Sequence, residues 1–208
     1  MAAMAAEHLI VYGGSFDPVH VGHLIPALRA REILAADRVL FLPANRSPFK
    51  MKQHPGASGP QRLEMLRLAM VGVAGCAADE RELHRAGPSY TVETLRELHA
   101  ERPGVRLTLL LGADQLQMLH GWKGIGEILD MAAVAILPRM TGMAADFSSV
   151  RRHLGDATAK RLEAGLLATP LVGISATEVR ARVRAGLSVR FWVPEGVAGF
   201  IAREGLYG

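Results

Sequence analysis

The sequence predicts an α/β fold built on a doubly wound parallel sheet, on two observations. Short continuous apolar runs, typical of strands buried on both faces, alternate with stretches of helical apolar spacing along almost the whole chain. The 208 residues are half hydrophobic and contain no internal repeat, low-complexity tract or clear linker. We therefore expect one domain over residues 1–208, with right-handed crossovers between its strands.

The elements follow from these patterns in chain order. Strands are expected at 9–12, 38–42, 106–111, 132–137 and 171–174. Helices are expected at 24–35, 61–73, 91–100, 114–119 and 125–129, with further helical patches at 150–154 and 158–167. An extended stretch is expected at 76–85. The motif-bearing core spans 9–139 and 171–180, with an accessory helical segment at 140–170 and C-terminal helices at 181–208.

The first expected strand runs into a glycine turn and then a helix, in the stretch Gly13-Gly14-Ser15-Phe16-Asp17-Pro18-Val19-His20-Val21-Gly22-His23. Paired glycines allow a sharp turn and a close approach of backbone N–H groups, and a helix N-terminus favours phosphate. Proline is tolerated in a first turn but not deep in a helix, so Pro26 places the helix start no earlier than about residue 21 or 22. His20 and His23 then lie at the mouth of the helix. The stretch predicts a nucleotide phosphate site, although glycines after a strand are also common turn formers.

The loop after the second expected strand carries Asn45, Arg46 and Lys50. Loops that leave the carboxyl end of a parallel strand lie beside the ligand site of such sheets. Position alone leaves two interpretations equally open. The loop is either an ordinary surface connection or a positively charged loop beside the phosphate site.

Polar and aromatic residues mark the middle of the chain. Gly87-Pro88 predicts a turn before the third expected helix, which Ser89 or Thr91 can cap. Asp114 follows the end of the strand at 106–111, and Trp122 lies in a short amphipathic segment. Capping alone explains the hydroxyls, and a lone tryptophan belongs to a core more often than to a ligand platform.

A second helix start near the C-terminus is also informative. Ser175 and Glu178 have capping-box spacing, which predicts a helix that runs to about Ala185. With a strand at 171–174, this helix N-terminus stands at the end of a strand. Arg180 in its first turns can reach a phosphate through a bidentate guanidinium, while a well-capped structural helix is the plainer interpretation.

Charge and composition limit the class of ligand and the cellular location that we expect. The net charge is +4, which suits anionic small molecules, and no run of five or more Lys or Arg points to nucleic acid. The single cysteine, Cys76, cannot form an intrachain disulfide. The N-terminus lacks signal-peptide features, and no apolar run approaches the roughly 18 residues of a membrane span. We expect a cytoplasmic protein that binds neither nucleic acid nor membrane. The oligomeric state is open, a homo-oligomer included.

Two motifs resemble the signatures of the HxGH nucleotidyltransferases. They are Gly-Gly-x-Phe-Asp-Pro-x-His-x-Gly-His from Gly13 to His23 and Ile-Ser-x-Thr-x-x-Arg from Ile174 to Arg180. Narrower features are similar to the bacterial type of nicotinate-nucleotide adenylyltransferase. They are Arg85-Ala86-Gly87-Pro88-Ser89-Tyr90-Thr91-x-x-Thr94-Leu95, Gly112-Ala113-Asp114 with Trp122 downstream, and the closing Ile201…Gly205-Leu206-Tyr207. The similarity runs from Leu9 to Tyr207 and is weakest at 140–170. It implies a Rossmann-like nucleotidyltransferase fold.

The resemblance implies transfer of AMP from ATP to nicotinate mononucleotide, giving nicotinate adenine dinucleotide and pyrophosphate in NAD biosynthesis. It assigns to ATP binding Gly13, Gly14, Ser15, Phe16, His20, His23, Asp114, Ile174, Ser175, Thr177 and Arg180. It assigns to the mononucleotide Asn45, Lys50, Ser89, Tyr90, Thr91, Trp122 and Arg139. The expected catalytic set is His20, His23, Lys50 and Arg180. Mg²⁺ is expected to be held mainly by the ATP phosphates, without a protein metal site.

Two positions depart from the family pattern. The family loop usually reads Pro-Pro-His-Lys, whereas this chain has Ser47-Pro48-Phe49-Lys50, so a histidine donor is missing and Phe49 receives no role. Ser15 replaces the commoner threonine and leaves the backbone donor in place.

Two rival functions stay open. Pantetheine-phosphate adenylyltransferase usually has threonine in place of the first histidine and a shorter chain, so His20 and Ser89–Thr91 count against it. The other rival is a non-catalytic nucleotide-binding regulator, against which the intact catalytic set counts.

Overall fold

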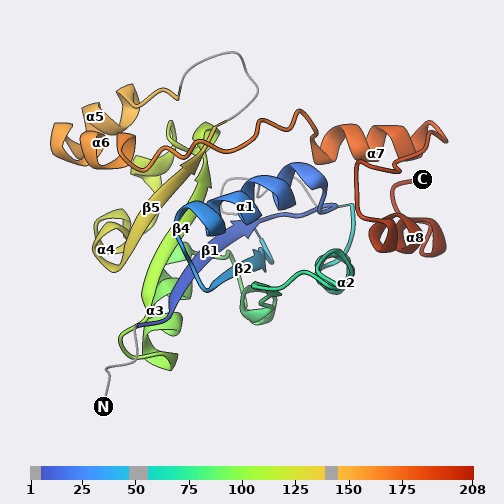
Figure 1. The fold of residues 1–208 in the computed structure, drawn as a ribbon, viewed down its shortest axis with the longest axis horizontal. Helices are drawn as coiled ribbons and strands as arrows, with labels where there is room; N and C mark the ends of the chain where they lie inside the picture. The colour runs from blue at the N-terminus through green and yellow to red at the C-terminus, as the bar shows by residue number, and fades with distance from the viewer. Residues whose placement is uncertain (1–5, 47–55, 139–144) are drawn as a thin grey trace.

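A five-stranded parallel sheet forms the centre of the computed structural model, which describes residues 6–46, 56–138 and 145–208 (Figure 1). The strands are β1 (His8–Gly14), β2 (Arg38–Pro43), β3 (Cys76–Ala78), β4 (Arg106–Gly112) and β5 (Ala132–Leu137). Their order across the sheet is β3-β2-β1-β4-β5, and every neighbouring pair is parallel. The chain winds outward from β1 in both directions, which is the doubly wound α/β fold predicted from the sequence.

Both faces of the sheet are buried, because alternate strand residues point to opposite sides. In β1, Ile10 and Tyr12 belong to one core cluster, and Leu9 and Val11 belong to the other. The first face is covered by α1 (Val21–Ile33), α2 (Gly59–Ala69), α7 (Ala176–Arg184) and α8 (Glu195–Arg203). The second is covered by α3 (Thr91–Glu101), α4 (Ile125–Met131), α5 (Ser148–Leu154) and α6 (Asp156–Glu163).

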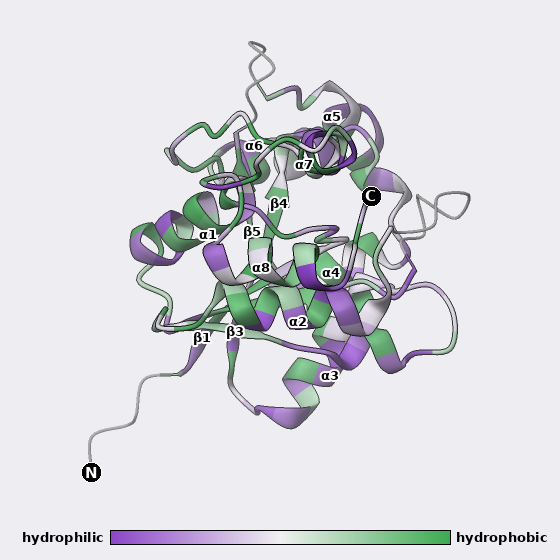
Figure 2. Ribbon diagram, turned by 90° about the vertical axis from the view of Figure 1, so that its right-hand side faces the viewer, coloured by the Kyte–Doolittle hydropathy of each residue, from purple (hydrophilic) through white to green (hydrophobic). Residues whose placement is uncertain are grey.

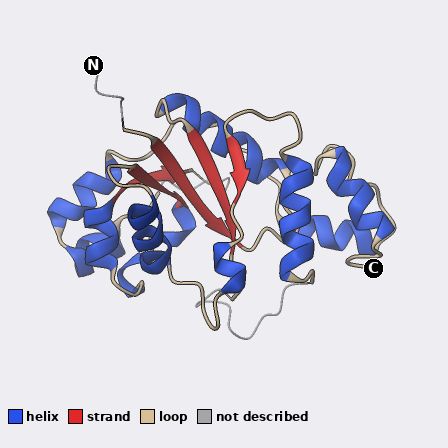
Figure 3. Cartoon of the chain, turned by 90° about the horizontal axis from the view of Figure 1, so that it is seen from below, coloured by secondary structure: helices blue, strands red, loops and turns tan. Residues whose placement is uncertain are grey.

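The views from other sides agree with this layering. Figure 3 shows the strands enclosed between helices. In Figure 2, hydrophobic and hydrophilic stretches alternate along helices such as α3, as expected where one side of a helix packs on a sheet. In the part of the chain that the structure describes, no helix is long and apolar enough to cross a membrane.

Most of the expected elements are confirmed. The strands at 9–12, 38–42, 106–111 and 132–137 each lie within an observed strand. The first helix begins at Val21, as the position of Pro26 predicted.

The strand expected at 171–174 is wrong. These residues form no strand, and Leu171 is 55% exposed. The chain meets the sheet edge earlier, where Leu166 bridges to Ile136 of β5. It then leaves the edge and reaches the start of α1, where the carbonyl oxygen of Ile174 lies against Gly22. A short apolar run alone therefore predicted neither the burial of this segment nor a neighbouring strand to pair with it.

The helix expected at 114–119 is also wrong. The chain forms two 3₁₀ turns instead, Ala113–Gln115 and Leu119–Gly121. The fully buried Leu116 and Leu119 are three residues apart, a spacing that a 3₁₀ turn satisfies as well as an α-helix does.

Two other segments differ in part from the expectation. The extended stretch at 76–85 is a short edge strand, β3, followed by a 3₁₀ turn at Arg81–His84. The helix expected at 158–167 ends at Glu163. Gly165 packs so closely on β5 that a Cβ there would lie 2.2 Å from the carbonyl oxygen of Val134, and the helix gives way to this contact.

Candidate active site

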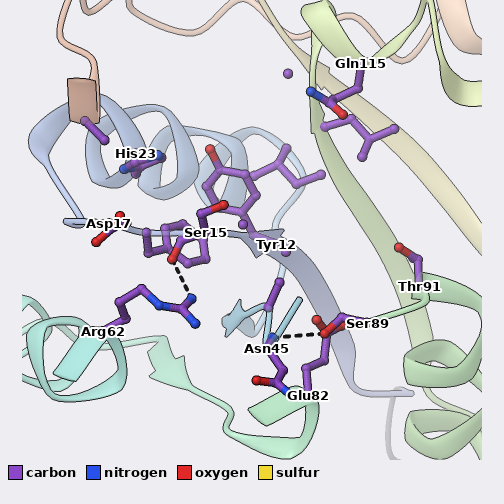
Figure 4. Close-up of a pocket in the computed structure, with 18 of the residues that line it drawn as sticks. Tyr12, Ser15, Asp17, His23, Asn45, Arg62, Glu82, Ser89, Thr91 and Gln115 are labelled. Atoms are coloured by element: carbon purple, nitrogen blue, oxygen red, sulfur yellow. Dashed lines mark hydrogen bonds between the residues drawn. The ribbon is translucent and has the colours of Figure 1, made fainter. Parts of the chain in front are cut away.

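A pocket of about 990 Å³ opens at the carboxyl ends of β1 and β4, where the winding of the sheet changes direction (Figure 4). Doubly wound sheets bind their ligands at this point. The sequence-predicted site residues that line the pocket are Gly13, Gly14, Ser15, Phe16, His20, His23, Asn45, Ser89, Tyr90, Thr91, Asp114, Trp122, Ile174, Ser175, Thr177 and Arg180. Lys50 and Arg139 lie outside the described residues. Segments that are far apart in the sequence therefore meet around one cavity.

The glycine turn after β1 borders this pocket with its backbone. A Cβ on Gly13 would meet no atom within 4 Å, so glycine leaves this part of the pocket open. A Cβ on Gly14 would lie 2.9 Å from the ring of Phe16. Phe16 has a φ of 48° and its side chain is only 1% exposed, so core packing holds it in this unusual conformation. The turn is thus fixed by the core beneath it.

Two histidines form the first turn of α1. His20 is the buried N-cap, and the ring centroids of His20 and His23 are 3.7 Å apart. The backbone N–H of His20 donates to Nδ1 of His23 at 3.3 Å. Because Nδ1 accepts a hydrogen bond, the neutral His23 ring carries its proton on Nε2, which is then a donor. The Phe16 ring packs edge-on against His23, with 5.1 Å between ring centroids, and holds it in place.

The second motif packs directly on the first. A Cβ on Gly22 would lie 2.9 Å from both Nδ1 of His20 and the carbonyl oxygen of Ile174, so glycine permits this approach. Ser175 then caps α7. Its Oγ accepts the N–H of Glu178 at 3.2 Å, and the Glu178 carboxylate accepts the N–H of Ser175 at 3.0 Å. The capping box predicted from the sequence is confirmed, and it places the start of α7 beside the start of α1.

Asp17 joins several elements around the pocket, and sequence reasoning gave it no role. Its carboxylate accepts the N–H groups of Gly56 and Ala57 at 2.7 and 3.0 Å and the hydroxyl of Tyr207 at 2.7 Å. Its carbonyl oxygen accepts Nη1 of Arg180 at 2.6 Å. Asp17 lies inside the glycine–histidine motif, but its partners come from distant parts of the chain, so no local pattern predicts them.

Two buried charged residues of the pocket wall were also missed. Arg62 is 1% exposed, and its Nη1 donates to the carbonyl oxygen of Ser15 at 2.8 Å. Glu82 is 6% exposed and accepts the hydroxyl of Thr94 at 2.7 Å, while burial raises its pKa. The apolar spacing of α2 places Arg62 on the same buried face as Met65. A charged residue on an apolar face was therefore the signal available for Arg62.

The opposite wall of the pocket is aromatic and hydroxyl-bearing. Ser89 Oγ accepts the N–H of Asn45 at 3.0 Å, which ties the loop after β2 to the start of α3. Nζ of Lys123 lies 4.2 Å above the centroid of the Tyr90 ring. Trp122 packs partly against the second core cluster and also lines the pocket. Flat apolar surfaces with a few polar groups are typical of sites for heteroaromatic rings.

The two walls suit different parts of a nucleotide. The helix start, the histidines and Arg180 provide donors and positive charge for phosphates. Among the described residues, no three His, Cys, Asp or Glu side chains are grouped to hold a metal ion. The arrangement suits the transfer of a phosphate-bearing group between two nucleotides.

The chain is similar to known nucleotidyltransferases in sequence. A family model described as Cytidylyltransferase-like matches residues 11–182. A Marinobacter nauticus protein named "Probable nicotinate-nucleotide adenylyltransferase" is 40% identical over 209 aligned residues, which cover 96% of each chain. A protein of the same name from Thermus thermophilus is 40% identical over 201 residues, covering 95% of this chain and 97% of the relative.

Solved structures share the fold. A Plasmodium falciparum nicotinic acid mononucleotide adenylyltransferase complexed with NaAD has a TM-score of 0.73 at 14% identity, and the match covers 97% of both chains. The same enzyme complexed with APC gives a TM-score of 0.71 at 14% identity and the same coverage.

Proposed function

The chain belongs to the cytidylyltransferase-like family and, within it, to the group named nicotinate-nucleotide adenylyltransferase, and from this we propose that it transfers AMP from ATP to nicotinate mononucleotide. The products are nicotinate adenine dinucleotide and pyrophosphate, in a step of NAD biosynthesis. One observation carries the proposal beyond family membership. The two phosphate-binding motifs and the aromatic wall line the same pocket.

The ATP end of the site is assigned to the starts of α1 and α7. We assign the triphosphate to the backbone from Gly13 to Phe16 and to the side chains of His20, His23 and Arg180. Helix N-termini favour phosphate, and the Nε2 donor inferred for His23 suits a phosphate oxygen. The remaining residues assigned to ATP are Asp114, Ile174, Ser175 and Thr177.

The mononucleotide end is assigned to the opposite wall. The pyridine ring is placed against Trp122, beside Ser89, Tyr90 and Thr91. Thr91 is the first residue of α3, and a helix N-terminus favours a carboxylate over a neutral amide. Asn45 borders the same region, and Lys50 and Arg139, outside the described residues, are proposed for the phosphates and the mononucleotide.

The reaction needs no covalent intermediate. A phosphate oxygen of the mononucleotide attacks the α-phosphorus of ATP in line, a new P–O bond forms, and the bond to the departing pyrophosphate breaks. The residues of the pocket bring the two phosphates together and stabilise the charge that develops during transfer. His20, His23, Lys50 and Arg180 are proposed for charge stabilisation.

Mg²⁺ is the proposed metal ion. We expect the ATP phosphates and water to supply most of its ligands, as is usual for this ion in nucleotide sites. Bound with ATP, the ion would neutralise phosphate charge, while the donors of the protein hold the phosphates.

Pyrophosphate release tests the proposed function. The protein is incubated with ATP and Mg²⁺ and with one of three acceptors: nicotinate mononucleotide, nicotinamide mononucleotide or phosphopantetheine. We expect turnover with the first and little with the other two. Turnover with phosphopantetheine would place the protein with the pantetheine-phosphate adenylyltransferases. Inactivity with all three, together with salt-dependent DNA binding, would favour a non-catalytic regulator.

A further inference from the structure

Arg62 is a buried cation beneath the phosphate end of the pocket. It lies on the apolar face of α2, is 1% exposed and lines the pocket wall. Its Nη1 donates to the carbonyl oxygen of Ser15 at 2.8 Å, and in Figure 4 its guanidinium points toward the turn that carries Ser15. Its Nε is buried with no hydrogen-bond partner among the described residues.

No carboxylate of the described residues pairs directly with Arg62. The negative charge of Asp17 raises the pKa of Arg62. Even so, within the described part of the chain no carboxylate oxygen lies within 4.0 Å of a guanidinium nitrogen of Arg62. The Asp17 carboxylate is used by Gly56, Ala57 and Tyr207, and it also lies 3.8 Å from Nη1 of Arg180. This group of side chains therefore contains two guanidinium ions for one carboxylate.

An unbalanced buried charge is costly in the free protein. Burial lowers the pKa of Arg62 while Asp17 opposes this effect, and an arginine stays charged at any ordinary pH. Replacement of a buried charge by an apolar side chain of similar size is often neutral or stabilising. Stability of the free fold is therefore a weak reason for an arginine at this position. A bound polyphosphate supplies the missing negative charge.

We propose that Arg62 is a positioning residue of the nucleotide site. It holds the Ser15 turn in the shape that receives the triphosphate of ATP. When ATP binds, the triphosphate balances the buried charge of Arg62. The inference rests on the proposed binding of ATP. It adds a residue that none of the motifs contains, on a helix that contributes none of the motif residues.

Calorimetric binding of ATP and of inorganic tripolyphosphate tests this role in the wild type, R62M, R62K and R67M. R67M is the matched control, because Arg67 lies on the same helix but is exposed and pairs with Glu80 at 3.2 Å. We expect R62M to weaken both ligands by about 10-fold or more. The Tm of ligand-free R62M should move by no more than about 4 °C. R62K keeps a charge and should stay within about threefold of the wild type, and R67M should match the wild type.

Steady-state kinetics separate positioning from a purely structural role. In R62M the KM for ATP should rise about 10-fold or more while the KM for the mononucleotide changes less than about twofold. Wild-type ATP affinity in R62M would overturn the inference, as would equal loss of both affinities together with a large fall in Tm. If R62M does not fold, R62K decides, and a folded R62K that has lost ATP binding would contradict the charge argument. A wild type that binds neither ATP nor tripolyphosphate would instead refute the proposed function.

Discussion

At the scale of single residues, the backbone fixes the chemistry of His23. The N–H of His20 occupies Nδ1 of His23, and Phe16 packs on the ring, so Nε2 carries the proton of the neutral ring and is its donor. We expect H23A to lower kcat by about 10²-fold or more, which is the loss typical of a transition-state donor. Steady-state pyrophosphate release measures this change.

A histidine outside the pocket provides the control for this variant. His84 lies in a 3₁₀ turn with 73% of its side chain exposed, so H84A should retain wild-type kcat. A wild-type kcat in H23A would remove His23 from the proposed catalytic set.

Trp122 is a second residue whose role can be measured directly. Stacking of a base on an aromatic side chain contributes about 1–3 kcal/mol in alanine-substitution measurements. If the pyridine ring stacks on Trp122, W122A should raise the KM for the mononucleotide by about 5-fold to 160-fold and change the KM for ATP little. W122F should recover most of this effect, because it restores an aromatic face.

The exposed Phe191 gives a matched aromatic control for Trp122. It is 83% exposed and does not line the pocket, so F191A should leave both KM values unchanged. Equal rises in both KM values for W122A would point to a general disturbance of the pocket rather than to stacking.

At the scale of elements, the N-terminus of α7 connects helix stability to the site. Ser175 and Glu178 satisfy the first N–H groups of a helix that carries Thr177 and Arg180 to the pocket. Loss of an N-cap hydroxyl to alanine costs about 1 kcal/mol, whereas glycine costs only a few tenths. We expect S175A to lower the urea midpoint more than S175G does.

The same pair of variants separates capping from ligand binding. Both lack the hydroxyl, so an equal rise in the KM for ATP would show that Ser175 Oγ contacts the nucleotide. A rise in S175A alone would show that the cap acts by holding α7 in place. Unchanged stability in both variants would contradict the capping energy assigned here.

A helix or strand could be predicted where its own residues show the pattern that defines it. Buried parallel strands are continuous apolar runs, so β1, β2, β4 and β5 could be located from sequence. The run at 171–174 is also mainly apolar but pairs with no strand, although β5 lies at the edge of the sheet, because pairing depends on where the whole fold places the run. The edge strand Cys76–Ala78 is too short and too weakly buried for periodicity to mark it.

The site shows the same division. His20, His23 and Ser175 belong to contiguous motifs at helix starts, so the sequence could single them out, and all three line the pocket. Asp17 and Arg62 act through partners on other elements, at Tyr207 and Ser15 respectively. Neither pairing leaves a trace in local spacing, apart from the charged side chain on the apolar face of α2.

At the scale of the whole molecule, the order of the strands explains why distant motifs meet. β1 lies at the centre between β2 and β4, so the loops after β1 and β4 diverge at the carboxyl edge and leave a crevice between them. The starts of α1, α3 and α7 all border this crevice. The start of α2 also lines the pocket, through Ser58 and Gly59. The N-termini of these four helices supply positive ends that suit a pair of phosphate-bearing substrates.

The opposite end of the sheet contains a titratable group that links strands from both halves of the fold. His8, in β1, is 5% exposed, and its Nε2 lies 2.8 Å from Oγ1 of Thr108 in β4. Its Nδ1 accepts Nη2 of Arg106 at 2.7 Å, so Nε2 carries the proton of the neutral ring. Protonation of His8 would place a second positive charge beside that of Arg106. Burial, and then Arg106, lower the pKa of His8 below its ordinary value of 6.5.

Because the pKa of His8 is lowered in the folded protein, the free energy of unfolding should fall as the pH falls. The unfolded chain binds the proton more readily than the folded protein, so the stabilising contribution is complete above about pH 6.5 and is lost as the pH falls toward the folded pKa. The loss is at most about 1.4 kcal/mol for each pH unit. Urea unfolding measures the free energy of unfolding of the wild type and H8Q at pH 7.5 and 5.5. Between these two pH values, this free energy should fall less in H8Q than in the wild type. H84Q is the control, because the side chain of His84 is exposed, and it should behave as the wild type. An equal fall in the wild type and H8Q would show that His8 is not the group that senses pH, because every other titrating group is common to both proteins.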